Sequence, residues 1–256
     1  MTTALLISTY NSPDYLRLCL SSVLAQRVQP DEIIIADDGS TDSTARVVKD
    51  FSLATRVPVK HIWHEDRGFR LAAIRNKGIA AATSDYIIQI DGDIILHPEF
   101  VADHKRFARP GSFVTGSRIL LSPDTTTSLL GLAPWSKPPQ LPGGFRCPVL
   151  TPLFARLRSR NGMYVRGCHM AFWRSDLLEV NGYNEDIVGW GREDSELSFR
   201  LINNGLKKRF IKFAALEYHL HHNEASRAMD AGNIAIMERA RTQSVTKVPH
   251  GITHSS

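Results

Sequence analysis

The sequence predicts an α/β fold in which a mostly parallel sheet is flanked by helices. Three observations support this class. Short apolar runs alternate with helical patterns through the first 120 residues, as in strand–helix–strand units. The runs at residues 32–36 and 86–90 are apolar enough for burial on both faces of a parallel sheet. The chain has 256 residues, 43% apolar and 22% charged, which excludes a disordered or fibrous protein.

The predicted elements of the first half follow a regular order. Residues 4–8 predict a strand, and Ser12 with Pro13 marks a helix whose apolar positions recur every three or four residues. Further strands are predicted at residues 32–36, 57–63 and 86–90. A helix at residues 71–82 separates the last two. Polar residues follow the strands' carboxyl ends, the edge at which such sheets bind ligands.

The second half is less regular. The proline-rich residues 125–161 predict a long loop without regular elements. Ordered structure is expected to resume at residues 164–173. Residues 192–204 predict a helix that ends at Gly205. From Glu224 to about Arg241 a helical tail is expected, and the last dozen residues are expected to fray.

This order predicts a single domain over residues 1–222. It comprises one half at 1–120, a proline-rich basic loop at 121–162 and a second half at 163–222. Residues 223–256 are the predicted helical C-terminal tail.

The positive charge is concentrated in one segment. The chain carries 31 Lys and Arg against 26 Asp and Glu, a net charge of +5. Residues 125–175 contain no acid and seven basic residues, which leaves 24 basic against 26 acidic residues elsewhere. The seven are Lys137, Arg146, Arg156, Arg158, Arg160, Arg166 and Arg174. An anionic partner is expected here, but not a nucleic acid, because the segment has few aromatics for base stacking.

The cysteines and the apolar runs restrict the class of protein. Cys19, Cys147 and Cys168 are widely spaced and predict neither a disulfide framework nor a thiolate metal site, which favours a reducing cytoplasm. No apolar run reaches the length of a transmembrane helix, and the N-terminal apolar stretch is too short for a signal peptide.

Two acidic motifs follow predicted strands. Asp37 and Asp38 open the segment DDGSTD, where adjacent carboxylates can hydrogen-bond a base or ribose; an ordinary strand-to-helix turn is the alternative. Asp91 and Asp93 flank Gly92, and two such carboxylates can bind a hard divalent cation. A plain turn is the alternative there too, although Ile94 and Ile95 make a hairpin unnatural.

Two arginines form a third motif. Arg70 and Arg75 can reach one anion if Arg70 lies at the mouth of its helix, and a diphosphate matches their planar forks. The alternative is a solvated basic helix face.

The segment GWGRED at residues 189–194 combines two unusual features. Trp190 lies between two glycines, which favours stacking on a sugar ring. Glu193 and Asp194 lie in the first turn of the next helix, where an ionised carboxylate can accept a proton. The alternative is a tryptophan that fills a core gap and acids that only complement the helix.

Three histidines lie close together in the segment YHLHH at residues 218–222. If the segment is extended, His219 and His221 face one way and His222 the other. A neutral imidazole can complete a metal site begun by Asp93, whereas a solvated polar patch is the alternative.

Together these motifs resemble glycosyltransferase family 2 with the GT-A fold, a Rossmann-like sheet with a C-terminal acceptor-binding part. The nucleotide half carries the matching strings at residues 9–11, 37–40, 75–78 and 91–93. The C-terminal half resembles the galactosyltransferase-type region of chondroitin-polymerase-like, β-1,4-galactosyltransferase and polypeptide N-acetylgalactosaminyltransferase enzymes. Its matching strings are residues 167–170, 181–183, 189–194 and 196–200.

The resemblance implies an inverting, metal-dependent transfer of a hexose or N-acetylhexosamine from a UDP-sugar to a glycan hydroxyl, in cell-surface polysaccharide or lipid-linked glycan synthesis. The implied nucleotide-sugar-binding residues are Ser8, Thr9, Tyr10, Asp38, Asp66, Arg70, Arg75 and Asp91. Among them, Asp38 is expected on the uracil and Asp91 on the ribose or a metal-bound water.

The resemblance also implies the metal ligands and the catalytic groups. Asp93 is expected to ligate Mn²⁺ or Mg²⁺ together with His219, for which His221 and His222 compete. The remaining roles fall on Asp194 as general base, Glu193 on the acceptor or donor sugar, and Trp190 with Gly191 on the acceptor.

Two other functions stay open from the residues. A sugar nucleotidyltransferase needs a glycine-rich triphosphate loop, which residues 5–11 lack. A non-catalytic nucleotide-sugar-binding module is the second. The basic segment predicts an anionic acceptor, such as a lipid-linked or phosphorylated glycan, met by peripheral association at the inner face of a membrane.

Overall fold

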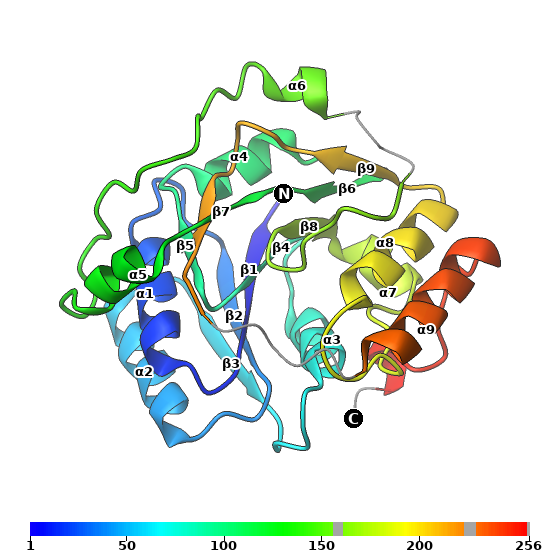
Figure 1. Ribbon diagram of the computed structural model, residues 1–256, viewed down its shortest axis with the longest axis horizontal. Helices are drawn as coiled ribbons and strands as arrows, with labels where there is room; N and C mark the ends of the chain where they lie inside the picture. The colour runs from blue at the N-terminus through cyan, green and yellow to red at the C-terminus, as the bar shows by residue number, and fades with distance from the viewer. Residues whose placement is uncertain (156–160, 223–228, 255–256) are drawn as a thin grey trace.

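The computed structural model describes residues 1–155, 161–222 and 229–254, and it confirms the α/β class (Figure 1). Seven strands form the larger sheet in the order β3-β2-β1-β4-β8-β6-β9. They are β1 (Thr3–Thr9), β2 (Glu32–Asp37), β3 (Val59–Trp63), β4 (Tyr86–Asp91), β6 (Ser112–Thr115), β8 (Met170–Trp173) and β9 (Lys207–Phe210). The first four are parallel, whereas β8 runs antiparallel to β4 and β6.

A smaller sheet of β5 (Ile94–Leu96), β10 (Glu217–His219) and β7 (Arg118–Leu120) lies beside the larger one. The chain leaves β4 at Asp91, turns, and enters β5 in this second sheet, so β4 and β5 form no hairpin. Ile94 and Leu96 pack into the main core, while Ile95 packs into a satellite cluster with Tyr218. The small sheet therefore brings β10, from near residue 220, to the turn that follows β4.

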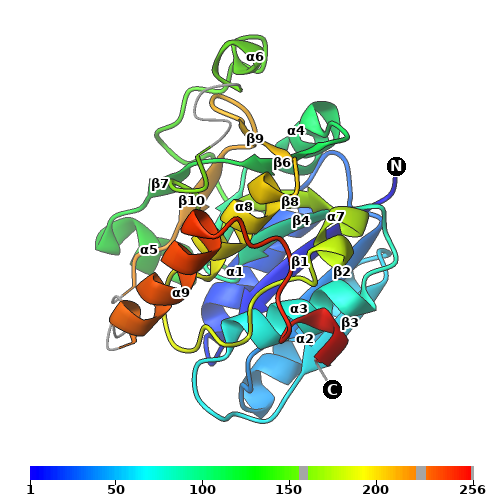
Figure 2. The same cartoon turned by 90° about the vertical axis from the view of Figure 1, so that its right-hand side faces the viewer.

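Helices cover both faces of the larger sheet (Figures 1 and 2). They are α1 (Pro13–Leu24), α2 (Asp42–Ala54), α3 (Leu71–Ala81), α4 (Phe100–Phe107), α5 (Pro123–Leu130), α6 (Thr151–Phe154), α7 (Arg174–Glu179), α8 (Glu193–Asn203), α9 (Asp230–Thr242) and the short 3₁₀ helix η1 (Ile252–His254). None of the described helices is both long enough and apolar enough to cross a membrane.

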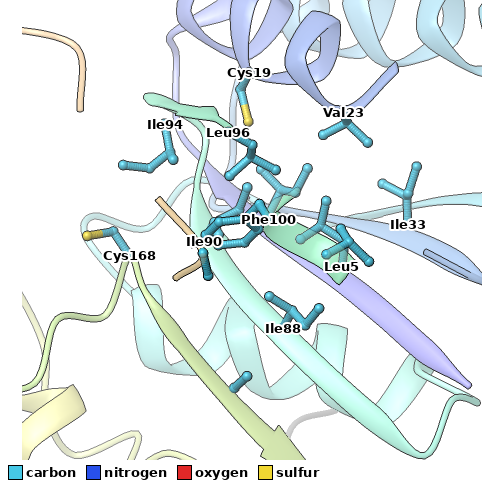
Figure 3. Close-up of a cluster of buried hydrophobic side chains, with 14 of the residues drawn as sticks. Leu5, Cys19, Val23, Ile33, Ile88, Ile90, Ile94, Leu96, Phe100 and Cys168 are labelled. Carbon is cyan, nitrogen blue, oxygen red and sulfur yellow. The ribbon is translucent and has the colours of Figure 1, made fainter. Parts of the chain in front are cut away.

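The alternation of strand side chains decides which helix packs where. Leu5 and Ile7 point into the cluster that α1, α2 and α4 cover, part of which Figure 3 shows. Leu6, between them, points to the opposite face, beneath α3, α7 and α8. All three side chains are fully buried, and each stabilises the fold by about 1.5–3 kcal/mol.

The proline-rich segment contains helices where the sequence predicted only loop. Ser122 caps α5, because its Oγ accepts a hydrogen bond from the Thr125 N–H, and Pro123 occupies the first helical turn. Proline is tolerated there because its missing N–H has no partner in a helix's first turn. Leu129 of α5 packs against Leu121 and the small sheet. The helix α6 forms a second short element, which lies apart from the main body in Figures 1 and 2.

The C-terminal part is also more ordered than predicted. The predicted tail helix is observed as α9, although residues 223–228 lie outside the described range. The expected fraying of the last dozen residues is wrong up to residue 254. The Ile252 N–H donates to the Asn181 backbone oxygen, and Ile252 packs against the core under α3. Local sequence has no signal for such a long-range contact.

Candidate active site

A group of possible metal ligands lies where the two sheets meet. Asp93 follows β4, and the Nε2 atoms of His222 and His219 lie 3.0 and 3.5 Å from its Oδ2. One ligand atom from each residue lies within 4.8 Å of the others. Asp93 Oδ1 is buried and has no hydrogen-bond partner among the described residues. Burial lowers the pKa of His219, so its imidazole is neutral and able to ligate.

This donor set fits a divalent cation. One carboxylate and two imidazoles are a mixed set, which suits Mn²⁺ better than the hard, oxygen-preferring Mg²⁺. The orphaned oxygen of Asp93 is the second observation that fits, since a cation would satisfy it.

The histidines are arranged differently from the extended pattern that the sequence predicted. β10 ends at His219, which pairs with Ile94 of β5, and the chain then turns. The Leu220 N–H donates to the backbone oxygen of Asp93 at 3.0 Å, which holds this turn against the acidic motif. His222 therefore lies on the same side as His219, their ring centroids 4.9 Å apart. His221 is not part of this group.

Arg75 is a buried link rather than a surface residue. Its guanidinium is 1% exposed and donates to Asp91 Oδ1 at 2.9 Å, Glu193 Oε1 at 3.1 Å and Ser8 Oγ at 3.2 Å. Arg70 lies at the start of α3, as the predicted shared anion requires, and that anion stays a prediction, whereas the alternative of a solvated face is wrong for Arg75. Helical periodicity could not reveal this, because the covering partner is α8, more than 100 residues away.

Glu193 and Asp194 begin α8 as predicted, and both are embedded in polar contacts. Asp194 accepts hydrogen bonds from the backbone N–H groups of Gly167 at 2.9 Å and Ser195 at 2.7 Å. Glu193 Oε2 is buried without a hydrogen-bond partner. Burial, reinforced by the neighbouring Asp194 charge, raises the pKa of Glu193 to about 7. Burial also raises the pKa of Asp194.

The expected base-binding residues gather at the ends of β1, β2 and β3. Asp38 is buried; its carboxylate lies 2.6 Å from His64 Nε2 and accepts from the Arg70 N–H at 2.9 Å. The Tyr10 hydroxyl donates to Asp66 Oδ2 at 2.8 Å. The guanidinium of Arg70 points elsewhere, with Nη2 donating to the Glu65 backbone oxygen.

Ser8 and Thr9 lie between the two acidic motifs. The Gly92 N–H donates to the Ser8 oxygen at 2.7 Å, and the Asp38 N–H donates to the Thr9 oxygen at 3.0 Å. The Thr9 Oγ1 atom is buried without a hydrogen-bond partner. The carboxyl ends of β1, β2 and β4 thus bring Asp38 and Asp91 to one edge of the sheet, as predicted.

Gly39 allows the segment after β3 to pack closely against the turn after β2. Its φ is +98°, and a Cβ built there would lie 2.6 Å from the Asp66 Cα. Only glycine allows the segment carrying Asp66 to approach this closely.

Trp190 and Gly191 lie on a loop before α8. Trp190 is 38% exposed, so the core-filling alternative is wrong and its ring has an accessible surface. Gly191 has a φ of +99° and is followed by Arg192 at +79°, both in the left-handed region.

One arginine of the basic segment pairs with an acid that lies outside the segment. Arg146 forms two hydrogen bonds to Asp103, at 2.9 and 2.6 Å. Arg156, Arg158 and Arg160 lie outside the described residues. Arg166 is exposed and precedes Gly167, whose N–H donates to Asp194.

Sequence reasoning missed His64, His222 as a partner of His219, and the buried role of Arg75. His64 had a usable signal, since it follows β3 at the same edge of the sheet as Asp38. Two further residues, Asp230 and Asn233 on α9, contact the loop that carries Trp190 and had no motif to identify them.

Two family models match the chain. One described as glycosyl transferase family 2 covers residues 4–180, and one described as the N-terminal domain of galactosyltransferase covers residues 156–223. Together they span both halves of the site.

Curated relatives match most of this chain. The validoxylamine A glucosyltransferase of Streptomyces hygroscopicus subsp. limoneus is 28% identical over 227 residues, which are 79% of this chain and 48% of that protein. The chondroitin synthase of Escherichia coli is 26% identical over 250 residues, 88% of this chain and 36% of that protein. The chain thus spans about half, or less, of the length of these relatives.

Solved structures share the fold at low identity. Residues 1–349 of S. aureus TarS superpose with a TM-score of 0.67 at 15% identity, covering 100% of this chain and 68% of that one. The same region in complex with UDP-GlcNAc gives 0.65 at 16%, covering 100% and 69%. The mannosyltransferase PcManGT from Pyrobaculum calidifontis, in complex with GDP-Man and Mn²⁺, gives 0.60 at 16%, covering 95% and 71%.

Proposed function

Because the chain belongs to glycosyltransferase family 2, we propose that it is an inverting, metal-dependent enzyme that uses a UDP-sugar. It moves a hexose or N-acetylhexosamine to a hydroxyl of a glycan acceptor in polysaccharide synthesis. The family membership sets aside the sugar nucleotidyltransferase and the non-catalytic binding module.

One observation carries the proposal. Arg75 joins Asp91, which opens the metal-binding turn, to Glu193, which opens the helix of the catalytic carboxylates. A charge-assisted link of this kind sets the distance between a diphosphate held at the turn and an acceptor held at the helix. A site that only bound a nucleotide sugar would not need the second carboxylate pair.

Asp194 is the general base of the proposed reaction. Within the described part of the chain its oxygens accept from two backbone N–H groups, so lone pairs remain for an acceptor hydroxyl. That hydroxyl oxygen attacks the anomeric carbon from the face opposite the diphosphate, and its proton passes to Asp194. The bond between the anomeric carbon and the diphosphate oxygen breaks, and UDP leaves with the electron pair.

Glu193 has a different role because Arg75 holds one of its oxygens. The other, Oε2, is buried without a hydrogen-bond partner and can accept from a sugar hydroxyl. We assign it to orienting the sugar rather than to proton transfer.

Asp93, His219 and His222 are the residues that would hold the cation. A divalent cation bound there supplies positive charge that offsets the charge growing on the departing diphosphate. Mn²⁺ is proposed on the strength of the mixed donor set and of the Mn²⁺ in the PcManGT complex.

The proposal of UDP rests on the resemblance to structures of TarS with UDP and UDP-GlcNAc. Asp38 would accept from the base, oriented by His64 and by the Arg70 N–H. Tyr10 and Asp66, joined by their hydrogen bond, would line the same end of the nucleotide.

The acceptor is proposed to be an anionic glycan, lipid-linked or phosphorylated, met by peripheral association at the cytoplasmic face of a membrane. Support comes from the absence of acids in residues 125–175 and from the exposure of Arg166 beside the catalytic helix. Arg146 does not contribute, because Asp103 neutralises it.

The test compares two variants that should fail for different reasons. Wild type is incubated with UDP-galactose, UDP-GlcNAc and UDP-GalNAc, Mn²⁺ and glycan acceptors, and release of UDP is measured. Asp194→Asn should keep Mn²⁺-dependent UDP binding and lose transfer by at least about 100-fold. Asp93→Ala should lose the Mn²⁺-dependent binding itself.

Transfer by Asp194→Asn near the wild-type rate would remove this residue from the mechanism. Mn²⁺-dependent UDP binding that survives in Asp93→Ala would remove the proposed metal site. Release of inorganic pyrophosphate from UTP and a sugar phosphate would instead favour a nucleotidyltransferase.

A further inference from the structure

The loop before α8 has an unusual backbone. Gly189, Gly191 and Arg192 have φ angles of +73°, +99° and +79°, three left-handed residues within four positions. Arg192 carries a side chain, so it adopts this conformation only where its surroundings impose it. The loop ends on Glu193 and Asp194, so any change in its path moves the catalytic carboxylates.

The first turn of α9 imposes that path through Arg192. Its Nε and Nη2 donate to the two carboxylate oxygens of Asp230, at 2.8 and 3.1 Å. This two-pronged geometry fixes the orientation of the guanidinium as well as its distance. The side chains are 31% and 23% exposed, so the pair is partly shielded from solvent.

A second residue of α9 holds the loop on both sides of Trp190. The Asn233 side chain is 2% exposed, and its Nδ2 donates to the Val188 oxygen at 3.0 Å and to the Gly191 oxygen at 3.1 Å. One amide group thus fixes the carbonyls on either side of the predicted stacking residue. Both hydrogen bonds are partly buried, and the lower local dielectric strengthens them.

The loop is tied to the nucleotide side at one further point. The Gly189 N–H donates to the Phe69 oxygen at 3.1 Å, in the segment that also carries Asp66 and Arg70. A Cβ on Gly189 would lie 2.9 Å from the Met229 Cγ, next to α9. The loop therefore lies between the nucleotide-side segment and α9.

These contacts are not needed to keep α9 on the protein. Its C-terminal half is fastened to α8 by the cluster of Phe199, Met237 and Ala240. Asn203 of α8 also donates to the backbone oxygens of Ala240 and Val245. Figures 1 and 2 show α9 lying along α8. The contacts of Asp230 and Asn233 with the loop are thus additional to those that hold α9 on α8.

We propose that α9 is a clamp in which Asp230 and Asn233 are positioning residues for acceptor binding and base geometry. Asn233 fixes the loop around Trp190, and Asp230 holds Arg192 in its left-handed conformation at the start of α8. The acceptor part of this inference rests on the proposed function. Asp230 and Asn233 contact Arg192, Val188 and Gly191 and not the nucleotide-side segment, which the loop meets at Gly189, so their loss should affect the acceptor more than the donor.

The test uses Asn233→Ala and Asp230→Asn with Glu238→Gln as the matched control. Glu238 pairs with Arg241 on the same helix, exposed to solvent and away from the loop. Steady-state kinetics give kcat and the acceptor KM, and calorimetry gives the Kd for UDP with Mn²⁺. Each clamp variant should lower kcat/KM for the acceptor by about tenfold or more, since losing hydrogen-bonded positioning acts directly on geometry. The Kd for UDP should change by less than about twofold.

A fluorescence measurement follows the loop without relying on catalysis. The emission of Trp190 is obtained as the difference between a protein and its Trp190→Phe derivative, and its quenching by iodide is recorded. Both clamp variants should show increased quenching, and Glu238→Gln should match wild type. Asp230→Glu, which keeps the charge, should recover part of the loss in both activity and quenching.

Unchanged Trp190 quenching in both clamp variants would overturn the inference. So would parallel losses in UDP affinity and acceptor kinetics, since a merely structural role predicts both. If no UDP-sugar is used by wild type, the proposed function fails, yet the quenching result still decides whether α9 holds the loop.

Discussion

The two sides of the site, proposed for the nucleotide and for the acceptor, are held by different means. On the proposed nucleotide side, Ser8, Asp38 and Asp91 lie at the carboxyl ends of adjacent parallel strands, and backbone hydrogen bonds fix their spacing. On the acceptor side, one loop is held by Arg75 from the core and by Asp230 and Asn233 from α9. The backbone sets the first arrangement, whereas a few polar side chains set the second.

This difference predicts which substitutions damage each side. Removing a charge should harm the proposed acceptor side most, because Glu193 and Arg192 there are each held by an ion pair, with Arg75 and Asp230. Substitutions that displace the backbone should harm the proposed nucleotide side most, because the positions of its side chains depend on where the strands end.

The largest effect is expected at Arg75, the link between the two sides. Arg75→Met should lower the free energy of unfolding by about 3–5 kcal/mol, because it leaves the partly buried carboxylate of Asp91 and the buried carboxylate of Glu193 without their counter-charge. Urea denaturation at neutral pH measures the loss. Arg75→Lys, which keeps the charge but not the fork, should fall between wild type and Arg75→Met.

Arg67→Met is the matched control for that experiment. Arg67 pairs with Glu65, and their side chains are 70% and 66% exposed, so its loss should cost at most about 1 kcal/mol. Equal losses for Arg67→Met and Arg75→Met would show that burial does not distinguish the two pairs.

The second-largest effect is expected in the pH dependence of the unfolding free energy, to which Glu193 contributes. Its pKa rises from 4.5 to about 7 on folding, which corresponds to about 3 kcal/mol. Between these values the folded chain holds a proton that the unfolded chain has lost, so stability falls as pH rises. The contribution is fully present below the unfolded pKa and is lost as pH passes the folded pKa.

Urea denaturation across this pH range, without divalent cations, should therefore show a steeper fall for wild type than for Glu193→Gln. The unfolding free energy of wild type minus that of Glu193→Gln should decrease by about 3 kcal/mol from below the unfolded pKa of Glu193 to above its folded pKa. Glu65→Gln, at an exposed position, should keep the wild-type slope. The same slope in wild type and Glu193→Gln would contradict the assigned pKa.

The smallest effects compare one glycine from each side. Gly39→Ala should destabilise the chain by about 2 kcal/mol or more, because the new Cβ meets the Asp66 backbone as well as an unfavourable φ. Gly189→Ala should cost about 1 kcal/mol, because its obstacle is the flexible Met229 side chain. Thermal and urea unfolding measure both.

Ligand binding should separate the same pair. Gly39→Ala should weaken UDP binding and spare the acceptor KM at saturating donor, whereas Gly189→Ala should do the reverse. If both variants change both parameters alike, the two sides of the site are not positioned independently.

Much of the nucleotide side was predictable because its signals are local. The strand at 86–90 and the acids after it are adjacent in sequence, and the edge of a parallel sheet brings such strand ends together. His64 obeys the same rule, since it directly follows β3 at the edge that carries Asp38, but no acidic motif marks that strand end.

The acceptor side was less predictable because its contacts are long-range. The sequence pattern of α3 shows which residues share a face, but not that α8 covers the face with Arg75. The arrangement of His219 and His222 depends on where β10 ends, which its pairing with β5 determines. The helix α5 was not predicted, because Pro123 can either interrupt a helix or occupy its first turn, and here it occupies the first turn.

The sequence by itself predicted the fold class, the edge of the sheet at which Asp38 and Asp91 meet, and the candidate residues Asp93, Trp190 and Asp194, because each follows from local pattern or from a family motif. Only the tertiary structure decided that Arg75 is an internal link, that His222 lies beside His219, and that Asp230 and Asn233 of α9 contact the loop before α8. Local patterns reflect the backbone's short-range preferences, whereas burial and charge pairing depend on which distant segments meet.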